Sequence, residues 1–406
     1  MERNYGWVIV GFGMVASCVG IGCLMSLGVF LQPIAQSMGW TRAGISSAVM
    51  VGFISMALGS MGWGTLSDRY GTRVVVLAGG TLLGLGLAAA SQASSLLAFQ
   101  MLFGGGVGLG CGSLYVPLTT AAASWFTRNR SVAVALVSAG MGLGSTVIGP
   151  LSRVLIDYYD WRTAMLGLAF LAWAIILPGA LLLRPAPAEA PSTGPALDSV
   201  SVTENMTPAQ AFRTPQFAAL ALANFACCAA HSGPIFHMVS YAIDCGVTSM
   251  SAVTVLGTAG FAGLGGRLLF GMIADRVGAR HVLAGGLAMQ ALAISLYPFA
   301  RDATSLYALA VLFGMAYGGV MPLYALLVRE YFSGRIMGTM FGAVSMTATF
   351  GMAIGPVAGG WLFDRFGSYI SLYVASCAIG VAAVAIALTV RPPSRSPSPL
   401  VSHGMA

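Results

Sequence analysis

The sequence contains no lysine, and all nineteen of its basic residues are arginine. A nucleotide-binding loop of the GxxxxGK[ST] type needs a lysine to contact the phosphates, so such a loop is excluded. Charged residues of either sign make up only 8% of the 406 residues, whereas soluble domains carry about 25%. The chain is therefore expected to lie in a lipid bilayer, and a self-contained ATP-driven pump is disfavoured.

Groupings of metal-binding or disulfide-forming residues are also absent. The seven cysteines fall mostly within apolar segments and none are paired at CxxC spacing, so free buried thiols are expected. His231 and His237 are six residues apart, which places them about 120° apart around a helix. We therefore expect no metal and no cofactor. The net charge of +7 comes from arginines scattered at segment ends, a distribution typical of membrane orientation, so no nucleic-acid partner is implied.

Long apolar runs dominate the rest of the chain, which is 57% hydrophobic with a mean hydropathy of +0.84. A membrane-spanning helix needs about 20 mainly apolar residues. Twelve segments qualify, and the first has no small-residue cleavage site, which favours a helix over a cleaved signal peptide. The segments lie near 7–33, 44–66, 73–93, 97–124, 131–156, 163–183, 216–242, 249–273, 281–300, 305–328, 337–363 and 369–390.

The arrangement of these segments predicts two halves. A stretch rich in Pro, Ala and Ser follows the sixth segment and is typical of a linker. We therefore expect a six-helix bundle at 1–184, a cytoplasmic linker at 185–215, a second bundle at 216–391 and a cytoplasmic tail at 392–406. With both termini in the cytoplasm, thirteen arginines lie inside and five outside, and this positive-inside bias predicts the orientation.

The two predicted halves share sequence landmarks. Residues 64–73 (GTLSDRYGTR) recur as 271–280 (GMIADRVGAR), an offset of 207, and the Gly-Pro pair at 149–150 recurs at 355–356, an offset of 206. A register kept within one residue indicates two six-helix units of the same topology, related by an axis along the membrane normal. The fold class expected is an all-α membrane protein with twelve transmembrane helices in a 6+6 pseudo-twofold arrangement.

The doubled G-x3-D-R-x-G-x-R loop in such a chain resembles the major facilitator superfamily. Several further stretches resemble its branch of monocarboxylate porters and oxalate/formate exchangers: 5–10 (YGWVIV), 26–34 (SLGVFLQPI), 39–46 (GWTRAGIS), 125–130 (WFTRNR), 140–144 (GMGLG) and 160–162 (DWR). The resemblance covers nearly the whole chain apart from the linker and the tail. It implies a transporter of small organic anions that works by alternating access.

Arg267 lies inside an apolar span, whereas the acidic residues lie near segment ends or in loops. A cation in hydrocarbon is costly unless it faces a partner or water, so an anionic substrate is the expected partner. A planar guanidinium suits a carboxylate because two N–H groups can meet two oxygens. The resemblance also places Arg267 at the substrate arginine of monocarboxylate transporters. The alternative is that its side chain extends to the cytoplasmic end of the helix and binds carbonyl groups there.

Two positions depart from the family pattern. Animal monocarboxylate transporters pair this arginine with an aspartate one turn earlier and with a lysine in the first helix, where this chain has Gly263 and Met25. Oxalate exchangers add a lysine in helix eleven, which is also absent. A single central cation favours a monoanion over a dianion, so oxalate is disfavoured. The departure leaves the proton site open, and His231, near a helix midpoint, is the first candidate for proton coupling. A neutral imidazole within the helix packing is an equal alternative.

The remaining candidates are polar side chains within spans and at loops. Tyr115 and Tyr317 are expected to line the substrate site, with packing or interfacial tyrosine as the alternative. Asn224, Ser345 and Thr347 are weaker candidates for the same site, since such groups more often serve helix packing. His237 is expected to be structural, with a gate or orienting role as the alternative. The resemblance implies that the doubled loops form a cytoplasmic gate, and solvated charges that set topology are the alternative. The gate residues are Asp68, Arg69, Arg73, Asp275, Arg276 and Arg280.

These observations predict a secondary transporter of a small monocarboxylate, of the lactate or pyruvate kind, in the cell membrane. Proton-coupled symport is the favoured mechanism, and the expected partners are the organic anion, a proton and the bilayer, with the protein a monomer. Organic-anion exchange is the first alternative, and a non-transporting membrane sensor is the second. An enzyme is disfavoured because no nucleophile–base pattern is present.

Overall fold

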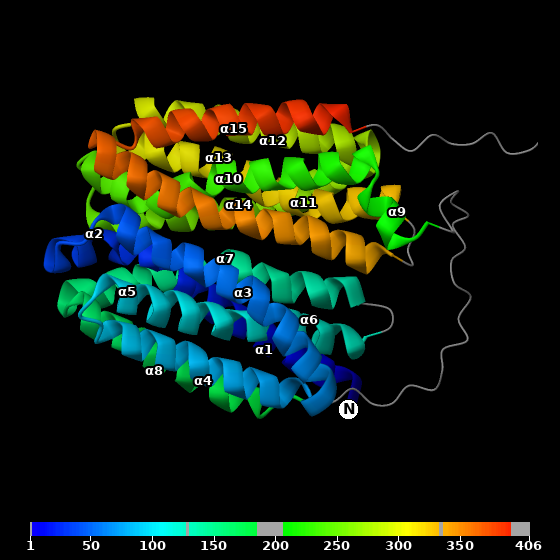
Figure 1. Cartoon of the computed structure of the whole chain (residues 1–406), viewed down its shortest axis with the longest axis horizontal. Coiled ribbons are helices and arrows are strands. Elements are labelled where there is room, and N and C mark those ends of the chain that lie inside the picture. The colour runs from blue at the N-terminus through cyan, green and yellow to red at the C-terminus, as the bar shows by residue number, and fades with distance from the viewer. Residues whose placement is uncertain (1, 127–129, 185–205, 333–335, 391–406) are drawn as a thin grey trace, which may run out of the picture.

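The computed structural model describes residues 2–126, 130–184, 206–332 and 336–390, and every regular element in these ranges is a helix (Figure 1). Figure 1 shows the helices of the first half beside those of the second, all roughly parallel to one long direction. The elements are α1 (Glu2–Met25), α2 (Leu27–Met38), α3 (Arg42–Tyr70), α4 (Thr72–Ser91), α5 (Leu96–Phe99), the π-helix η1 (Gln100–Val107), α6 (Gly108–Ser124), α7 (Arg130–Tyr158), α8 (Trp161–Ala180), α9 (Pro208–Phe212), α10 (Pro215–Asp244), α11 (Ser249–Val277), α12 (Ala279–Leu296), the 3-10 helix η2 (Tyr297–Phe299), α13 (Ala303–Tyr331), α14 (Met337–Phe366) and α15 (Ile370–Thr389).

Twelve helical segments in the described ranges are long and apolar enough to span a membrane, which confirms the number expected from the sequence. The first differs in detail. It runs from Tyr5 to Met38 and is interrupted at Ser26, between α1 and α2. The Ser26 hydroxyl donates to the Cys23 carbonyl at 2.8 Å, and Pro33 lies inside α2. A proline has no N–H to donate to the preceding turn, so a continuous ladder of hydrogen bonds through 7–33 is ruled out.

The internal repeat extends to the helix caps. Helices α3 and α11 are both 29 residues long and start 207 residues apart. The Thr41 side chain caps α3 and the Thr248 side chain caps α11. Each accepts a hydrogen bond from the backbone N–H three residues further along the chain. Such caps satisfy N–H groups that have no partner within the helix. The two halves therefore repeat in structure as they do in sequence.

The glycine shared by the doubled loops has a specific backbone role. Gly71 follows α3 with φ +84°, and Gly278 follows α11 with φ +91°. A side chain with a Cβ rarely adopts this conformation, so glycine allows the chain to reverse into the next helix at once. Backbone geometry therefore accounts for the glycine that the two loops share.

Each half is held together by close helix packing. Within the first half α1 packs along α7, and within the second α10 packs along α14 and α11 along α13. A Cβ on Gly140 would lie 2.0 Å from the Met14 carbonyl oxygen, and one on Gly266 would lie 2.1 Å from the Met315 carbonyl oxygen. Small residues thus let the backbones approach, as expected in lipid. The halves meet where α3 contacts α14, α7 contacts α11, and α2 contacts α10.

The proposed linker is not wholly irregular. Residues 185–205 lie outside the described ranges, but α9 forms within the predicted linker of 185–215. Thr207 and Gln210 form a reciprocal capping box at its start, and Pro208 occupies its first turn. These residues favour a helix start, and the Pro-rich composition of the stretch concealed them. The tail at 392–406 also lies outside the described ranges.

Candidate functional site

Arg267 lies on α11 at the junction between the two halves. Its side chain is half-buried, and its Nη1 approaches the Ser138 carbonyl oxygen of α7 at 3.5 Å. A Cβ on Gly142 would lie 3.3 Å from its Nη2. Among the described residues, no carboxylate oxygen lies within 4 Å of this guanidinium. The cation thus extends from the second half to the first without a native counter-ion in the described structure.

The glycine motif at 140–144 explains how α7 can pack closely against α1 on one side and α11 on the other. Gly140 and Gly144 are four residues apart and face α1, where a Cβ on Gly144 would lie 2.6 Å from the Gly22 nitrogen. Residues at this spacing share a helix face, whereas Gly142 points to the other side. Gly142 is therefore free to receive the Arg267 side chain from α11. The sequence showed the motif but not which helix each glycine would face.

Tyr317 and His231 lie next to each other in the second half. The centre of the Tyr317 ring on α13 lies 5.4 Å from that of the His231 imidazole on α10. A Cβ on Gly263 would lie 3.6 Å from the Tyr317 ring. Two of the candidates chosen from sequence, a phenol and an imidazole, are thus brought together from α13 and α10. The Tyr317 ring also lies against Gly263, one turn before Arg267 on α11.

His231 also belongs to a buried polar network that the sequence did not reveal. Its Nδ1 lies 3.9 Å from the Cys227 Sγ, and the Cys227 thiol lies 3.7 Å from the Gln290 Oε1. The Gln290 amide in turn donates to the Cys227 carbonyl at 3.3 Å. All three side chains are almost completely buried. Gln290 was missed because its place in the apolar α12 carried no motif.

The other candidate side chains are less clearly part of the site. Asn224 lies seven residues before His231, about 10 Å along α10. Its Nδ2 donates to the Val344 carbonyl of α14 at 3.2 Å, and its Oδ1 accepts a long bond from Cys228. These contacts join α10 to α14, and the Thr347 hydroxyl does the same by donating to the Ala221 carbonyl.

Ser345 lies half-buried on α14. The side chain of Tyr115, on α6, lies outside what the structure describes.

The doubled loops lie at the end of the molecule where α1 begins and α15 ends (Figure 1). Arg69, Arg73, Asp275 and Arg276 are exposed, and none has an ion pair among the described side chains; the Asp68 side chain is outside that set. The Arg280 Nη2 donates to the Leu388 carbonyl at 2.7 Å, which joins α12 to α15. Arg280 therefore makes its hydrogen bond within the second half. Gating by these loops stays a prediction.

At the opposite end, the halves are joined by a polar cluster that sequence reasoning missed. We call it the interdomain clasp: Gln32, Arg42, Asp244, Asp364 and Tyr369. Arg42 pairs with Asp244 at 3.1 Å, and the Gln32 amide donates to the other Asp244 oxygen at 3.0 Å. The Arg42–Asp244 pair is the one ion pair that joins the halves within the described structure.

The clasp also uses the start of a helix. The backbone N–H groups of Arg42 and Ala43 donate to the two Asp364 oxygens at 3.1 and 2.8 Å. A carboxylate is favoured at a helix N-terminus because the first N–H groups lack helical partners and carry partial positive charge. Here the capping carboxylate belongs to the other half. The Arg42 guanidinium also lies 3.7 Å from the centre of the Phe363 ring, a cation–π contact.

His237 connects to the clasp through Tyr369. Arg42 Nη1 donates to the Tyr369 hydroxyl at 2.8 Å, and that hydroxyl lies 3.1 Å from His237 Nδ1. His237 Nε2 lies 2.8 Å from the Pro356 carbonyl, which can only accept, so Nε2 carries the hydrogen. Burial raises the pKa of Tyr369 to about 12, so its hydroxyl stays neutral. His237 therefore contacts the clasp through Tyr369 and the α14 backbone through Pro356, and both the structural role expected for it and the gate or orienting alternative stay predictions.

The cysteines and the Arg153–Asp157 pair complete the description of the polar groups. All seven cysteines are free, as expected. Arg153 and Asp157, four residues apart on α7, form an ion pair within the helix, with Arg153 Nε 3.0 Å from Asp157 Oδ1. Among the described residues, no group of three metal-ligating side chains is present.

Comparison with known proteins agrees with this architecture. The sequence matches the family model described as Major Facilitator Superfamily over residues 10–277 and 266–404. It is 28% identical to monocarboxylate transporter 13 of Bos taurus over 100% of this chain and 95% of that protein. It is 26% identical to monocarboxylate transporter 2 of Homo sapiens over 94% of this chain and 84% of that protein.

Two solved structures share the fold. A bacterial homologue of the human lysosomal transporter Spinster, inward-facing and unoccupied, has a TM-score of 0.74 at 15% identity, covering 96% of this chain and 95% of that one. The nucleoside transporter NupG has a TM-score of 0.76 at 12% identity, covering 95% of this chain and 100% of that one. At these identities the likeness concerns the fold alone.

Proposed function

Since this chain belongs to the Major Facilitator Superfamily and is similar to monocarboxylate transporters throughout its length, we propose that it carries a small monocarboxylate across a membrane by alternating access. It is a multi-pass membrane transporter, not an enzyme. The observation that carries the proposal is the Arg267 guanidinium, which lies between α11 and α7 with no carboxylate within 4 Å among the described residues.

The substrate carboxylate binds at Arg267. Its two oxygens accept the two parallel N–H groups of the guanidinium, and the single cation selects a monoanion. The Tyr317 phenol, whose ring lies against Gly263 one turn before Arg267, gives the carboxylate or a substituent a further hydrogen-bonding group. Because Arg267 joins α11 of one half to α7 of the other, an anion bound there is sensitive to the relative position of the halves.

Alternating access then follows from the two ends of the molecule. The interdomain clasp supports a state closed at the Arg42 end, and the Arg267 site would exchange substrate with the other side. When the halves rock, the clasp separates and the end carrying the doubled loops closes. We propose that the latter end faces the cytoplasm in the cell membrane, as the arginine distribution indicates.

Proton coupling is proposed at His231. Its buried ring is 5.4 Å from the Tyr317 ring, so a charge on the imidazole would act on the phenol that we place at the substrate site. Movement of a proton with a monoanion makes the transported set neutral, which lowers the electrostatic cost of crossing the bilayer. Exchange of one organic anion for another is the alternative, and the same experiment separates the two.

The test is uptake into proteoliposomes of the purified protein, with a panel of radiolabelled monocarboxylates and with or without an imposed pH gradient. Symport predicts uptake that a proton gradient drives, whereas exchange predicts uptake that needs an internal anion and ignores the gradient. Arg267→Gln is expected to reduce uptake by about 10-fold to 100-fold, because charged hydrogen bonds contribute about 1.5–3 kcal/mol. Arg365→Gln, which changes an exposed arginine, is the matched control. Normal uptake by folded Arg267→Gln protein would contradict the substrate role.

A further inference from the structure

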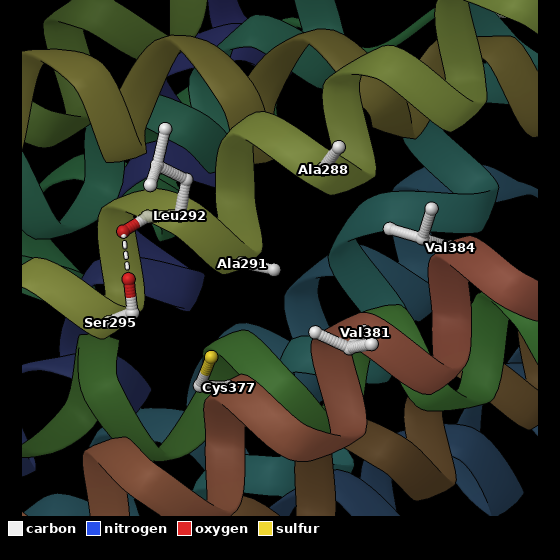
Figure 2. A pocket seen from close by; sticks show the side chains of 7 residues that line it. All are labelled: Ala288, Ala291, Leu292, Ser295, Cys377, Val381 and Val384. Carbon is white, nitrogen blue, oxygen red and sulfur yellow. Dashed lines mark hydrogen bonds between the residues drawn. The ribbon is translucent and has the colours of Figure 1, made fainter.

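A groove on the outside of the second half is separate from the Arg267 site. It lies between α12 and α15 and consists of two hollows of about 300 and 740 Å³ that share Ser295 and Cys377. Figure 2 shows the smaller hollow, with Ala288, Ala291 and Leu292 on one wall and Cys377 on the other. The larger volume falls within the range of about 300–1,000 Å³ typical of ligand sites. The shared residues make one continuous groove.

The walls of this groove are mostly apolar, and the Ser295 hydroxyl on one wall already has a hydrogen-bond partner. The Ser295 hydroxyl donates to the Leu292 carbonyl at 2.8 Å, within its own helix (Figure 2). The floor is closed where α15 approaches α12, since a Cβ on Gly380 would lie 3.0 Å from the Ala291 Cβ. A groove of this kind on the face of a membrane-spanning bundle suits a flexible hydrocarbon chain.

The mouth of the groove carries a positive charge. Arg301 lines the larger hollow just beyond the end of α12, beside Phe299, which is 82% exposed. No acidic side chain lies within 4 Å of the Arg301 guanidinium in the described part of the chain. The neighbouring Asp302 carboxylate accepts from the Ser305 N–H and hydroxyl at the start of α13. Aromatic and arginine side chains at a span end lie at the level of lipid headgroups.

We propose that this groove is a binding site for an anionic glycerophospholipid. One acyl chain occupies the groove between α12 and α15, and the headgroup phosphate pairs with Arg301. The charge selects the occupant: an apolar helix from a partner protein would fill the groove but leave Arg301 without a counter-ion. A zwitterionic lipid carries a cationic group that weakens the same attraction.

The test uses the full-length protein in phosphatidylcholine nanodiscs containing a trace of phosphatidylglycerol with a diazirine in one acyl chain. After irradiation, labelled peptides are mapped by mass spectrometry. Labelling should concentrate on the facing stretches 288–295 and 377–384. Phosphatidylcholine with the same diazirine chain should label them about fivefold less, a factor expected for one basic residue at an anionic membrane surface.

Two variants separate the headgroup and chain parts of the proposal. Arg301→Gln should remove the preference for phosphatidylglycerol, and Arg365→Gln, another exposed arginine, should keep it. Cys377→Phe should reduce labelling in the groove, whereas Ile379→Phe, on an exposed position of the same helix, should not. Labelling that is uniform over the lipid-facing helices, or equal for the two lipids, would overturn the proposal. So would groove labelling that Arg301→Gln and Cys377→Phe both leave unchanged.

Discussion

Arg267 shows how much one residue can reveal when its surroundings are apolar. Its charge, its position within a span and the absence of a nearby acidic residue could all be read from the sequence. Its contact with α7 could not, because it depends on how the halves pack. The same holds for Gln290 and Cys227, which support His231 only because α12 lies against α10.

Gly142 provides a residue-scale test of the Arg267 position. In Gly142→Ala the new methyl group would lie 3.3 Å from Arg267 Nη2, so the guanidinium must shift. We expect the apparent KM for the monocarboxylate to rise about tenfold, since a displaced charged contact costs about 1.4 kcal/mol or more. The measurement is concentration-dependent uptake in proteoliposomes. Gly285→Ala, with no atom within 4 Å of its added Cβ, should keep the KM, and an unchanged KM in Gly142→Ala would contradict the proposed geometry.

His231 provides the second test at this scale. His231→Asn retains a polar side chain but cannot take up a proton near neutral pH. We expect loss of accumulation driven by a pH gradient, while exchange of internal for external substrate continues. His281→Asn is the control, because His281 lies exposed at the start of α12 and bonds the Val277 carbonyl. Unchanged coupling in His231→Asn would remove His231 from the proton pathway.

At the scale of elements, local sequence explains where most helices begin and end. Thr41, Thr248, Ser95 and Asp302 cap helices at matching places in the two halves, as side chains with a short polar group favour. The interruption between α1 and α2, and the π-helical turn at η1, were not predicted. Both lie in continuous apolar runs, where hydropathy gives no signal of a break.

The glycines of the doubled loops allow a test of backbone strain with an internal control. Gly71→Ala and Gly278→Ala place a Cβ at positive φ, and each should destabilise the protein by about 1–3 kcal/mol. Gly64→Ala and Gly271→Ala change helical glycines of the same motif that have open space around them, so these should be neutral or slightly stabilising. The measurement is the melting temperature of each of the four variants in detergent. Equal melting temperatures in the two pairs would show that the loop glycines are not kept for their backbone conformation.

At the scale of the whole molecule, the relation between the halves is carried by the interdomain clasp. In Arg42→Gln the ion pair with Asp244 is lost, which should favour separation of the halves at that end. A population shift of about tenfold is expected if the pair contributes about 1.4 kcal/mol. The measurement is the rate of thiol labelling of Ser240→Cys, a residue buried beneath the clasp, by a membrane-impermeant reagent.

Two controls make this test specific. Arg153→Gln breaks an ion pair within a single helix of the first half and should leave the labelling rate unchanged. The charge exchange Arg42→Asp with Asp244→Arg should return the rate toward that of the unmodified clasp. Slow labelling in Arg42→Gln would mean that the remaining contacts, including the Asp364 cap, close this end without the ion pair.

The sequence alone determined the membrane class, the number of spans and the repeat of the halves, and it singled out Arg267 as the candidate substrate residue, because hydropathy, spacing and a charge in an apolar run are properties of the chain itself. The tertiary structure decided which residues meet across the halves. The clasp joins residues more than 200 positions apart, and the groove that we propose as a lipid site is formed by α12 and α15 together. Such contacts depend on how whole helices pack, and a linear pattern of residues carries no record of which faces will oppose each other.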